Sequence, residues 1–273
     1  MGKHKWSEKE IEWLIENYPK TNRYYCSKEL NIGLEQVVYK INKLKLKKEK
    51  SLDYSFFEVI DKPYVAYILG FIWADGYLTK DGRHFNVSGV EEDIDEIESL
   101  FDKLGNWCKH TDNREKYGWK NAKTLIGSNK EIYDFLLEHD YNKKSYVSAD
   151  KILSKIPDDL KHYFFRGLID GDGCFYYNKK GYLRQFALTS TYEQDWSYFE
   201  DLCNQLGVKY EIKRIKKFNK KTKKENKSSV VRILGKPIVT LGEYLYQGEQ
   251  LGLKRKQFIY NQIKTSYECN KSN

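Results

Sequence analysis

The chain has 273 residues, enough for two or three small domains that each bury a core. Its net charge of +9 and sequence pI of about 9.0 favour a polyanionic partner such as nucleic acid, although ribosomal and membrane-surface proteins share this balance. With 23 Tyr and only 4 Pro, the composition excludes an intrinsically disordered chain.

The five cysteines argue against a zinc ribbon and a disulfide framework, because their number is odd and no C-x-x-C pair occurs. We therefore expect reduced thiols and a cytoplasmic location, in a prokaryotic, phage or organellar setting. Met1–Trp6 is polar and basic, unlike a secretory signal. The longest apolar run, Tyr64–Ala74, is too short to cross a bilayer, so no membrane partner is expected.

Residues 1–50 predict a small all-helical domain. Ser7 and Glu10 have the spacing of a capping box, which starts a first helix. A second and a third helix are expected over Arg23–Leu30 and Leu34–Leu44, joined by a short turn. This helix pair resembles a helix-turn-helix of Myb-like or phage-endonuclease type.

The third helix has an outward face that could reach a DNA major groove and its phosphates, through Gln36, Tyr39, Lys40 and Lys43. The alternative is a three-helix packing module with a solvated polar face. The lysine run that follows, as far as Lys50, would track a phosphate backbone or remain solvated chain.

Residues 54–146 and 159–267 predict two units with the same element order, αββαββα, separated by a linker at 147–158. In the first unit we expect helix 63–74, strands 77–79 and 84–90, helix 94–104, two strands within 107–126, and helix 130–137. In the second we expect helix 160–171, strands 174–177 and 182–189 around a turn at Lys179–Gly181, helix 193–206, strands 208–215 and 229–234, and helices 237–245 and 254–263.

Each unit opens with a copy of one nine-residue stretch, Ile68–Gly76 (ILGFIWADG) and Phe165–Gly173 (FRGLIDGDG). The copies are about 97 residues apart, a domain-scale period. Both read as an apolar helix that ends in Asp-Gly.

Small residues lie four apart on one face of each helix, at Gly70 and Ala74 and at Gly167 and Gly171. A glycine inside a helix costs about 1 kcal/mol relative to alanine, so it usually has a packing reason. We infer that the two helices pack closely along these faces and bring the acids at their C-terminal ends together.

Such a pair of acids, Asp75 and Asp172, is electrostatically unfavourable. Helix C-termini carry partial negative charge, and two neighbouring carboxylates repel each other. A divalent cation between them would reverse both penalties. The alternative for either copy alone is an ordinary Asp-Gly helix stop.

These two stretches resemble the motif of the LAGLIDADG homing endonucleases, and two motifs in one chain resemble the monomeric, pseudo-twofold branch. The resemblance covers about Tyr54–Tyr267 and is specific at the motifs. It implies an α+β fold in which each repeat presents a curved, four-stranded antiparallel sheet, so that the two repeats form a DNA-binding saddle. The sixth motif position, Trp73 or Asp170 here, is not the family's metal ligand.

The resemblance also implies a catalytic role for Asp75 and Asp172 as ligands of a divalent metal, taken here as Mg²⁺ because it prefers oxygen ligands. The backbone carbonyls of Ala74 and Gly171 could add ligands. Lys254 lies where the family often has a catalytic lysine; the alternative is a surface helix start that contacts phosphates.

Asn142 takes the place of Lys254 in the first repeat, which leaves open whether both strands are cut equally fast. We expect Asn142, Lys144 and Lys256 to contact DNA. Further DNA contacts are expected from the sheets, where alternate side chains share a face, at His84, Asn86, Ser88, Lys109, Arg114, Arg184, Lys213 and Arg214. The loop 213–227 holds nine Lys or Arg against one Glu, which predicts a hairpin arm that contacts phosphates; the alternative is a solvated flexible loop.

The sequence thus predicts a monomeric, site-specific, metal-dependent endonuclease acting on double-stranded DNA. By the resemblance it would cut both strands across the minor groove and leave short 3′ overhangs. Two alternatives remain: a catalytically inactive DNA-binding regulator on the same scaffold, and an RNA maturase that assists intron splicing.

Overall fold

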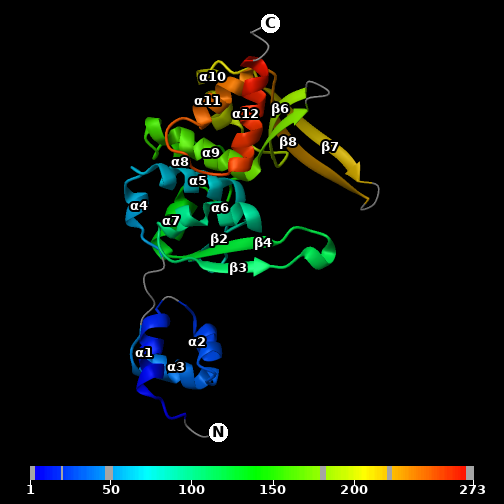
Figure 1. Cartoon of the computed structure of the whole chain (residues 1–273). Coiled ribbons are helices and arrows are strands. Elements are labelled where there is room, and N and C mark those ends of the chain that lie inside the picture. Colours follow the sequence, from blue (N-terminus) through cyan, green and yellow to red (C-terminus); the bar gives the residue numbers. More distant parts are fainter. Residues whose placement is uncertain (1–3, 20, 47–51, 179–182, 220–222, 269–273) are drawn as a thin grey trace.

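The computed structural model describes residues 4–19, 21–46, 52–178, 183–219 and 223–268. A three-helix bundle stands at one end, and two larger α/β units follow it (Figure 1). The turn predicted at Lys179–Gly181 and three residues of the lysine run, Lys47, Lys48 and Lys50, lie outside the described residues.

The N-terminal bundle consists of α1 (Glu8–Asn17), α2 (Arg23–Glu29) and α3 (Leu34–Lys43). The predicted capping box is present: Ser7 N–H donates to the Glu10 carboxylate at 2.7 Å, and Glu10 N–H donates to Ser7 Oγ at 3.3 Å. The bundle has a hydrophobic cluster of its own, made of Leu14, Cys26, Ile32, Val37 and Ile41.

The first large unit has the predicted order αββαββα, preceded by a short helix, α4 (Ser55–Glu58). Its elements are α5 (Pro63–Asp75), β1 (Gly76–Leu78), β2 (His84–Val90), α6 (Glu91–Asp102), β3 (Cys108–Asp112), the 3₁₀ turn η1 (Glu115–Tyr117), β4 (Ala122–Ser128) and α7 (Lys130–Glu138).

The second large unit repeats this order after α8 (Asp150–Leu153) and the 3₁₀ turn η2 (Asp158–Leu160). Its elements are α9 (Lys161–Asp172), β5 (Gly173–Asn178), β6 (Leu183–Ser190), α10 (Ser197–Gln205), β7 (Glu211–Asn219), β8 (Lys224–Leu234), α11 (Pro237–Leu245) and α12 (Lys254–Glu268). None of the described helices is both long and apolar enough to cross a membrane.

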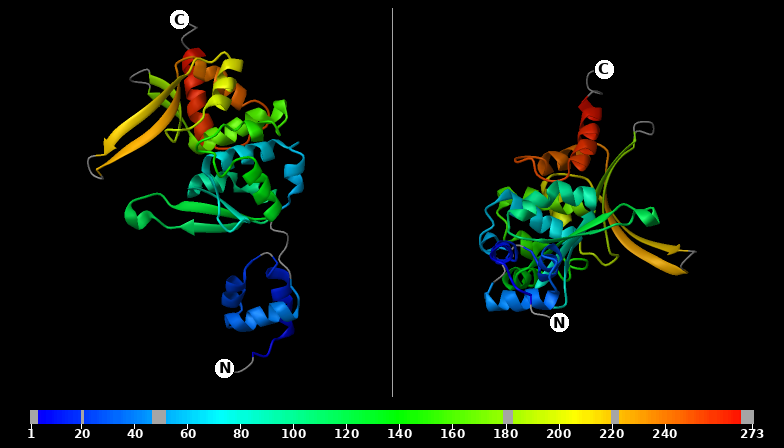
Figure 2. Two further views of the ribbon diagram at one scale, coloured as in Figure 1. Left: turned by 180° about the vertical axis from the view of Figure 1, so that it is seen from behind. Right: turned by 60° about the horizontal axis from the view of Figure 1, so that its bottom comes forward.

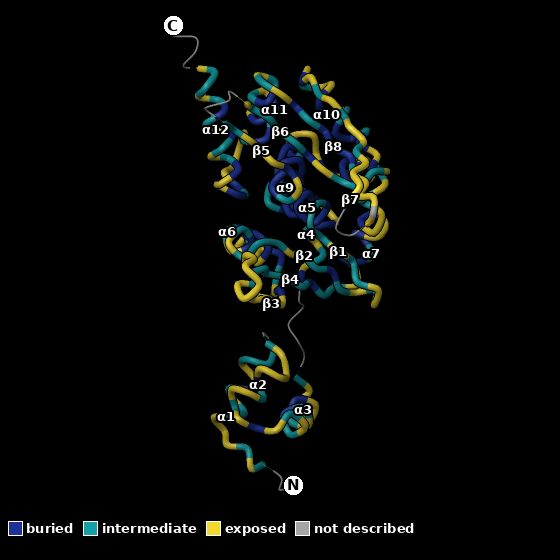
Figure 3. Tube along the Cα trace, turned by 90° about the vertical axis from the view of Figure 1, so that its right-hand side faces the viewer, coloured by how far each residue is buried: buried dark blue, intermediate teal, exposed yellow. Residues whose placement is uncertain are grey.

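Each unit builds one antiparallel sheet, in the orders β1-β2-β4-β3 and β5-β6-β8-β7. The two orders are equivalent, so the internal repeat extends from the motifs to the whole topology. The predicted α+β class, with two αββαββα repeats and two four-stranded antiparallel sheets, is confirmed. Both sheets lie on one side of the molecule, with α5 and α9 between the units (Figure 3).

The contact between α5 and α9 brings two helix backbones together. A Cβ added at Gly70 would lie 1.9 Å from the Phe164 carbonyl oxygen, and one added at Gly167 would lie 2.0 Å from the Tyr67 carbonyl oxygen. No side chain fits at either position, which explains the helical glycines that the sequence retains.

Register decides which side chains face away from the core. In the first sheet Phe85 and Val87 of β2 are buried against the helices, so Asn86 and its alternating neighbours face solvent. In the second sheet Phe186 and Leu188 of β6 are buried in the same way.

The bounds of several elements differ from the prediction. Helix α10 begins at Ser197 rather than Glu193, because the buried Gln194 amide donates to the Val147 and Asp195 carbonyls and fixes a turn before the helix. Strands β7 and β8 are longer than predicted, because they continue into the lysine-rich segment as the hairpin arm that we predict there. The predicted linker contains α8.

We predict that Gly70→Ala destabilises the large units by about 1–3 kcal/mol, because the backbones must separate to accept a methyl group. Helix propensity alone would give the opposite sign, a gain of about 1 kcal/mol. Thermal unfolding followed by circular dichroism measures the effect. Gly33→Ala is the control, since nothing lies within 4 Å of its added Cβ; an unchanged Tm for Gly70→Ala would contradict the backbone contact.

Candidate active site

Asp75 and Asp172 are the last residues of α5 and α9, and the structure brings these helix ends together. A Cβ added at Gly171 would lie 2.3 Å from the Ala74 Cβ and 3.0 Å from Asp75 Oδ2. The small residues at the fourth position after Gly70 and Gly167 therefore allow the ends, as well as the middles, of the two helices to meet.

Both carboxyl groups have raised pKa values. Burial raises the pKa of Asp75 to about 6, and the neighbouring Asp172 charge adds to this effect. Asp172 is partly accessible to solvent, but the protein around its carboxyl group removes much of its hydration. This desolvation raises the pKa of Asp172 as well. No donor among the described residues forms a hydrogen bond with either carboxylate.

Two lysines counter this negative charge, the half-buried Lys144 in the first unit and the buried Lys256 in the second. Lys144 Nζ donates to the carbonyls of Ile72, at 3.2 Å, and of Ala74. Lys256 Nζ donates to the carbonyls at the end of α9, at 2.7 Å to Ile169, 2.5 Å to Asp170, 3.3 Å to Gly171 and 2.7 Å to Gly173. Each ammonium thus satisfies carbonyl groups that a helix C-terminus leaves without partners.

The same lysines act electrostatically on the acids, since each lowers the pKa values of Asp75 and Asp172. Burial in turn lowers the pKa of Lys144 to about 8 and also lowers that of Lys256. The four groups form a compact cluster of two carboxylates and two ammonium groups at the seam between the units.

The segments that carry the lysines are held against the motif helices. Tyr141 OH donates to the Leu69 carbonyl at 3.0 Å, three residues before Lys144. In the second unit, Leu253 N–H donates to Asp170 Oδ2 at 2.9 Å, three residues before Lys256. These contacts bring each lysine to its helix end.

The two halves of the cluster are not identical. Asp170, the sixth residue of the second motif, is buried and accepts a hydrogen bond from Tyr67 OH of α5 at 2.8 Å. The corresponding residue of the first motif is Trp73, whose ring lies 6.5 Å from that of Phe164 in α9. A polar contact on one side of the helix pair thus has an apolar counterpart on the other.

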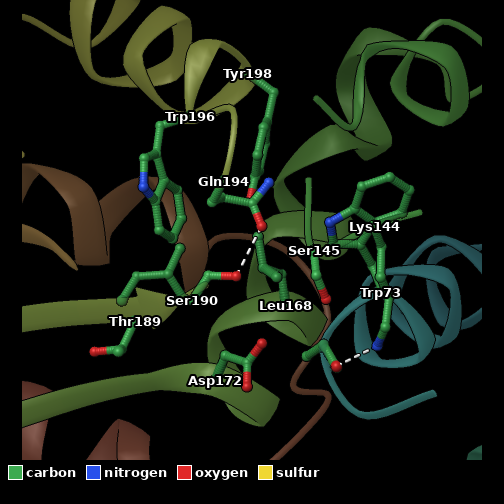
Figure 4. Close-up of a pocket in the computed structure, with 12 residues that line it drawn as sticks. Trp73, Lys144, Ser145, Leu168, Asp172, Thr189, Ser190, Gln194, Trp196 and Tyr198 are labelled. Atoms are coloured by element: carbon green, nitrogen blue, oxygen red, sulfur yellow. Dashed lines mark hydrogen bonds between the residues drawn. The ribbon is translucent and has the colours of Figure 1, made fainter. Parts of the chain in front are cut away.

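A small cavity of about 30 Å³ adjoins Asp172. Figure 4 shows Asp172 and Lys144 at its edge, with Ser190 and Gln194 joined by a hydrogen bond of 2.7 Å above them. This volume holds about one water molecule beside polar groups. The lining residues are Trp73, Ala74, Lys144, Ser145, Leu168, Asp172, Leu188, Thr189, Ser190, Gln194, Trp196 and Tyr198.

Several residues that we expected to contact DNA occupy the solvent-facing side of a sheet. His84, Asn86 and Ser88 alternate with the buried residues of β2, and Lys213 pairs with Val230 on the corresponding face of the second sheet. Ser88 Oγ lies 2.8 Å from Thr124 Oγ1 of β4, on the same face.

Other expected contacts point elsewhere. Lys109 lies on the opposite face of the first sheet and pairs with Asp102 at 2.8 Å. Arg184 Nε donates to Ser266 Oγ of α12 at 2.7 Å, on the core side of its sheet. Arg214 also has core-side register and donates to the Tyr192 carbonyl, while Arg114 pairs with Asp112 at 2.8 Å.

The structure does not bring Lys254 to the acids. Its side chain is 88% exposed and its Nζ lies 3.6 Å from Glu96 of α6, while Asn142, its counterpart, is exposed. The cations beside the acids are Lys144 and Lys256, for which we had expected contacts to DNA. Matching the repeats could have found them, because each stands two residues after the Asn142 and Lys254 pair.

The donor set fits a hard divalent cation. Mg²⁺ is commonly held by one or two carboxylates together with water and substrate phosphates, and Asp75 and Asp172 supply two. Among the described residues no group of three or more His, Cys, Asp or Glu side chains could hold a metal. The carbonyls of Ala74 and Gly171, which we expected to add ligands, accept hydrogen bonds from Lys144 and Lys256.

Residues 159–245 match the family model of the LAGLIDADG-like domain. No curated protein matches the chain. The chain resembles the solved structure of the homing endonuclease I-WcaI bound to its DNA recognition sequence, at 19% identity and a TM-score of 0.48, over 74% of this chain and 87% of that one.

Two other solved structures are similar. I-SmaMI, bound to uncleaved DNA target in the presence of calcium ions, has 14% identity and a TM-score of 0.46, over 77% of this chain and 92% of that one. Full-length DUF199/WhiA from Thermatoga maritima has 13% identity and a TM-score of 0.45, over 75% of this chain; the match spans only 60% of the WhiA chain.

Removal of one charge from the acid pair should stabilise the free protein above neutral pH. The folded Asp75 carboxyl, with a pKa of about 6, keeps a proton that the unfolded group releases near 4, so stability falls as the pH rises through this window. Asp75→Asn should gain on the order of 1 kcal/mol at pH 8 and nothing at pH 4, measured by thermal unfolding.

Addition of millimolar Mg²⁺ at pH 8 should raise the Tm of the wild-type protein more than that of Asp75→Asn, because a cation that binds only the folded state stabilises it. Asp61→Asn, at an exposed carboxyl just before the start of α5 and so at the opposite end of that helix from Asp75, is the matched control. If Mg²⁺ did not change the Tm of the wild-type protein, or if Asp75→Asn were less stable than the wild type at pH 8, the proposed acid pair would be contradicted.

Proposed function

We propose that this chain is a divalent-cation-dependent endonuclease that hydrolyses both strands of a double-stranded DNA site. The proposal rests on the pair of aspartates at one glycine-lined helix crossing, together with the lysines Lys144 and Lys256 beside them, between two antiparallel sheets. The match of residues 159–245 to the LAGLIDADG-like domain supports the same reading.

The residues of the chain have distinct roles in this proposal. Asp75 and Asp172 would hold Mg²⁺, which supplies charge neutralisation at the phosphate and an activated water. Lys144 and Lys256 hold the carbonyl ends of α5 and α9 in place, which fixes the directions of the two carboxylates. Their positive charges also favour the negative charge that develops on the phosphate during attack.

A single chain provides both acids and both sheets, so we propose that it acts as a monomer on duplex DNA. The sheet faces turned from the core carry Asn86 and Ser88 in one unit and Lys213 and Arg232 in the other. Amides, hydroxyls and basic groups are the side chains that read base edges and phosphates.

Asp75→Asn and Asp172→Asn should each abolish double-strand cleavage while changing DNA affinity less than about tenfold, because the acids hold the cation and face little of the DNA. Incubation with a genomic library and Mg²⁺, scored for discrete cuts, first identifies a site; gel shifts in Ca²⁺ then measure binding. Asp61→Asn should cut normally. Full cutting by the Asp172→Asn protein would refute the site.

We also propose that the N-terminal bundle adds a DNA contact through α3, as a helix-turn-helix does. The exposed side of α3 carries Tyr39, 66% exposed, and Lys43, while Lys40 Nζ lies over the Trp6 ring at 5.2 Å. This face is basic and aromatic, which suits phosphates and groove edges.

Lys43→Ala should weaken DNA binding for all sequences alike and reduce the slope of log affinity against log salt by about one, as expected for the loss of one phosphate contact. Fluorescence anisotropy at several salt concentrations measures both. Lys9→Ala, at an exposed position of α1, is the control. An equal loss for the two variants would leave α3 without a specific role.

A further inference from the structure

The β3–β4 hairpin carries a side chain that has nothing to pack against. Trp119 is 68% exposed and makes no ring, hydrogen-bond or ionic contact with its side chain among the described residues. Its loop, residues 113–121, contains the 3₁₀ turn η1, which is followed by Gly118 with φ of 73°. An indole has a large apolar face and one N–H donor, so an indole exposed on a structured loop can stack against a flat partner.

The three cations of this loop already have partners. Arg114 Nε lies 2.8 Å from Asp112, Lys120 Nζ lies 2.7 Å from Glu92, and Lys116 Nζ lies over the Tyr117 ring at 4.9 Å. Without free cations the loop is poorly suited to clamp phosphates, so affinity at this place must come from the indole itself.

Trp119 forms one wall of a hollow of about 420 Å³ between the hairpin and the start of α6. Three carboxylates line the hollow, from Glu91 and Glu92 of α6 and from Glu115, and the one cation that lines it, Lys120, is paired with Glu92. A flat group with an apolar face and N–H donors on its edge fits such a lining, whereas a phosphate would be repelled. The lining residues are Val90, Glu91, Glu92, Glu115, Gly118, Trp119, Lys120 and Asn121.

A nucleobase has this combination of features. Bases stack on indole faces whatever their sequence, and carboxylates accept hydrogen bonds from exocyclic amino groups. The hairpin projects to the same side as the β7–β8 hairpin of the other unit in all three ribbon views (Figures 1 and 2). A strand bound across the two sheets would therefore run close to it.

We propose that this hollow receives one unstacked base of a bound strand, with Trp119 against the base face and Glu91 or Glu115 accepting from its exocyclic amino group. Adenine, cytosine and guanine carry that group and thymine does not. The proposal rests on the proposed function only in that nucleic acid bound across the sheets delivers the base.

The test compares end-labelled single-stranded oligo(dA) and oligo(dT) of equal length, with the whole chain in EDTA so that no cleavage intervenes. Fluorescence anisotropy should show tighter binding of oligo(dA). Trp119→Ala should weaken oligo(dA) binding about tenfold and remove most of the preference, because stacking is worth about 1–3 kcal/mol per base. Trp119→Phe should retain it, and Glu91→Gln with Glu115→Gln should reduce it.

Phe218→Ala is the matched control, because Phe218 is 67% exposed on the other hairpin; its affinity ratio for the two oligonucleotides should stay that of the wild type. An unchanged ratio in Trp119→Ala, or an equal loss in Phe218→Ala, would overturn the proposal. If the chain cleaves duplex DNA but Trp119 does not affect its preference for oligo(dA) over oligo(dT), only the base-binding hollow is refuted. A Trp119-dependent preference without any cleavage removes only the nuclease.

Discussion

The backbone contact between α5 and α9 holds the two large units together and determines where both acids lie. Because Gly70 and Gly167 have no side chains, each helix lies against a carbonyl of the other. Ala74 and Gly171 extend this contact to the helix ends, so Asp75 and Asp172 cannot separate. The chain accepts two desolvated carboxylates in one place, and this is costly unless a positive group or a cation lies between them.

Lys144 and Lys256 reduce the repulsion between the two acids and donate hydrogen bonds to the carbonyls at the ends of α5 and α9. Lys144 and Lys256 satisfy carbonyls that would otherwise lack partners, and they lower the pKa values of both acids. Burial also lowers the pKa of each lysine, because desolvation disfavours the charged ammonium form. The cluster thus has two carboxylates and two ammonium groups, and burial shifts the pKa of every one of them. Shifted pKa values of this kind are typical of functional sites.

The sequence predicted much of this arrangement because local rules and the internal repeat agree. Two Asp-Gly helix ends with small residues four apart predicted the crossing and the acid pair. The capping box at Ser7 and the strand His84–Val90 also depended only on neighbouring residues, and the structure places them as expected.

Other features of the site and the sheets depend on tertiary contacts, which the spacing of residues in the sequence does not reveal. Lys256 is buried only because the preceding segment is anchored to Asp170, and nothing local distinguishes it from the exposed Lys254. Toward its tip the β7–β8 hairpin has polar residues on both faces. The ends of its two strands there lack the apolar–polar alternation that identifies a strand, so the sequence did not predict how far the strands extend. Arg184 faces α12 because of a register that the sequence alone leaves undetermined.

We expect the helix crossing to make the two carboxyl groups titrate as a coupled pair, and a divalent cation to relieve their repulsion. Carbon-13 NMR of aspartate-labelled protein, with Asp75→Asn and Asp172→Asn for assignment, measures this directly. We predict that Asp75 titrates near pH 6 in the free protein, that its pKa falls when Asp172 is replaced, and that Mg²⁺ moves both carboxyls to lower pKa values. Two independent titrations near pH 4, unaffected by the partner's removal or by Mg²⁺, would contradict the account.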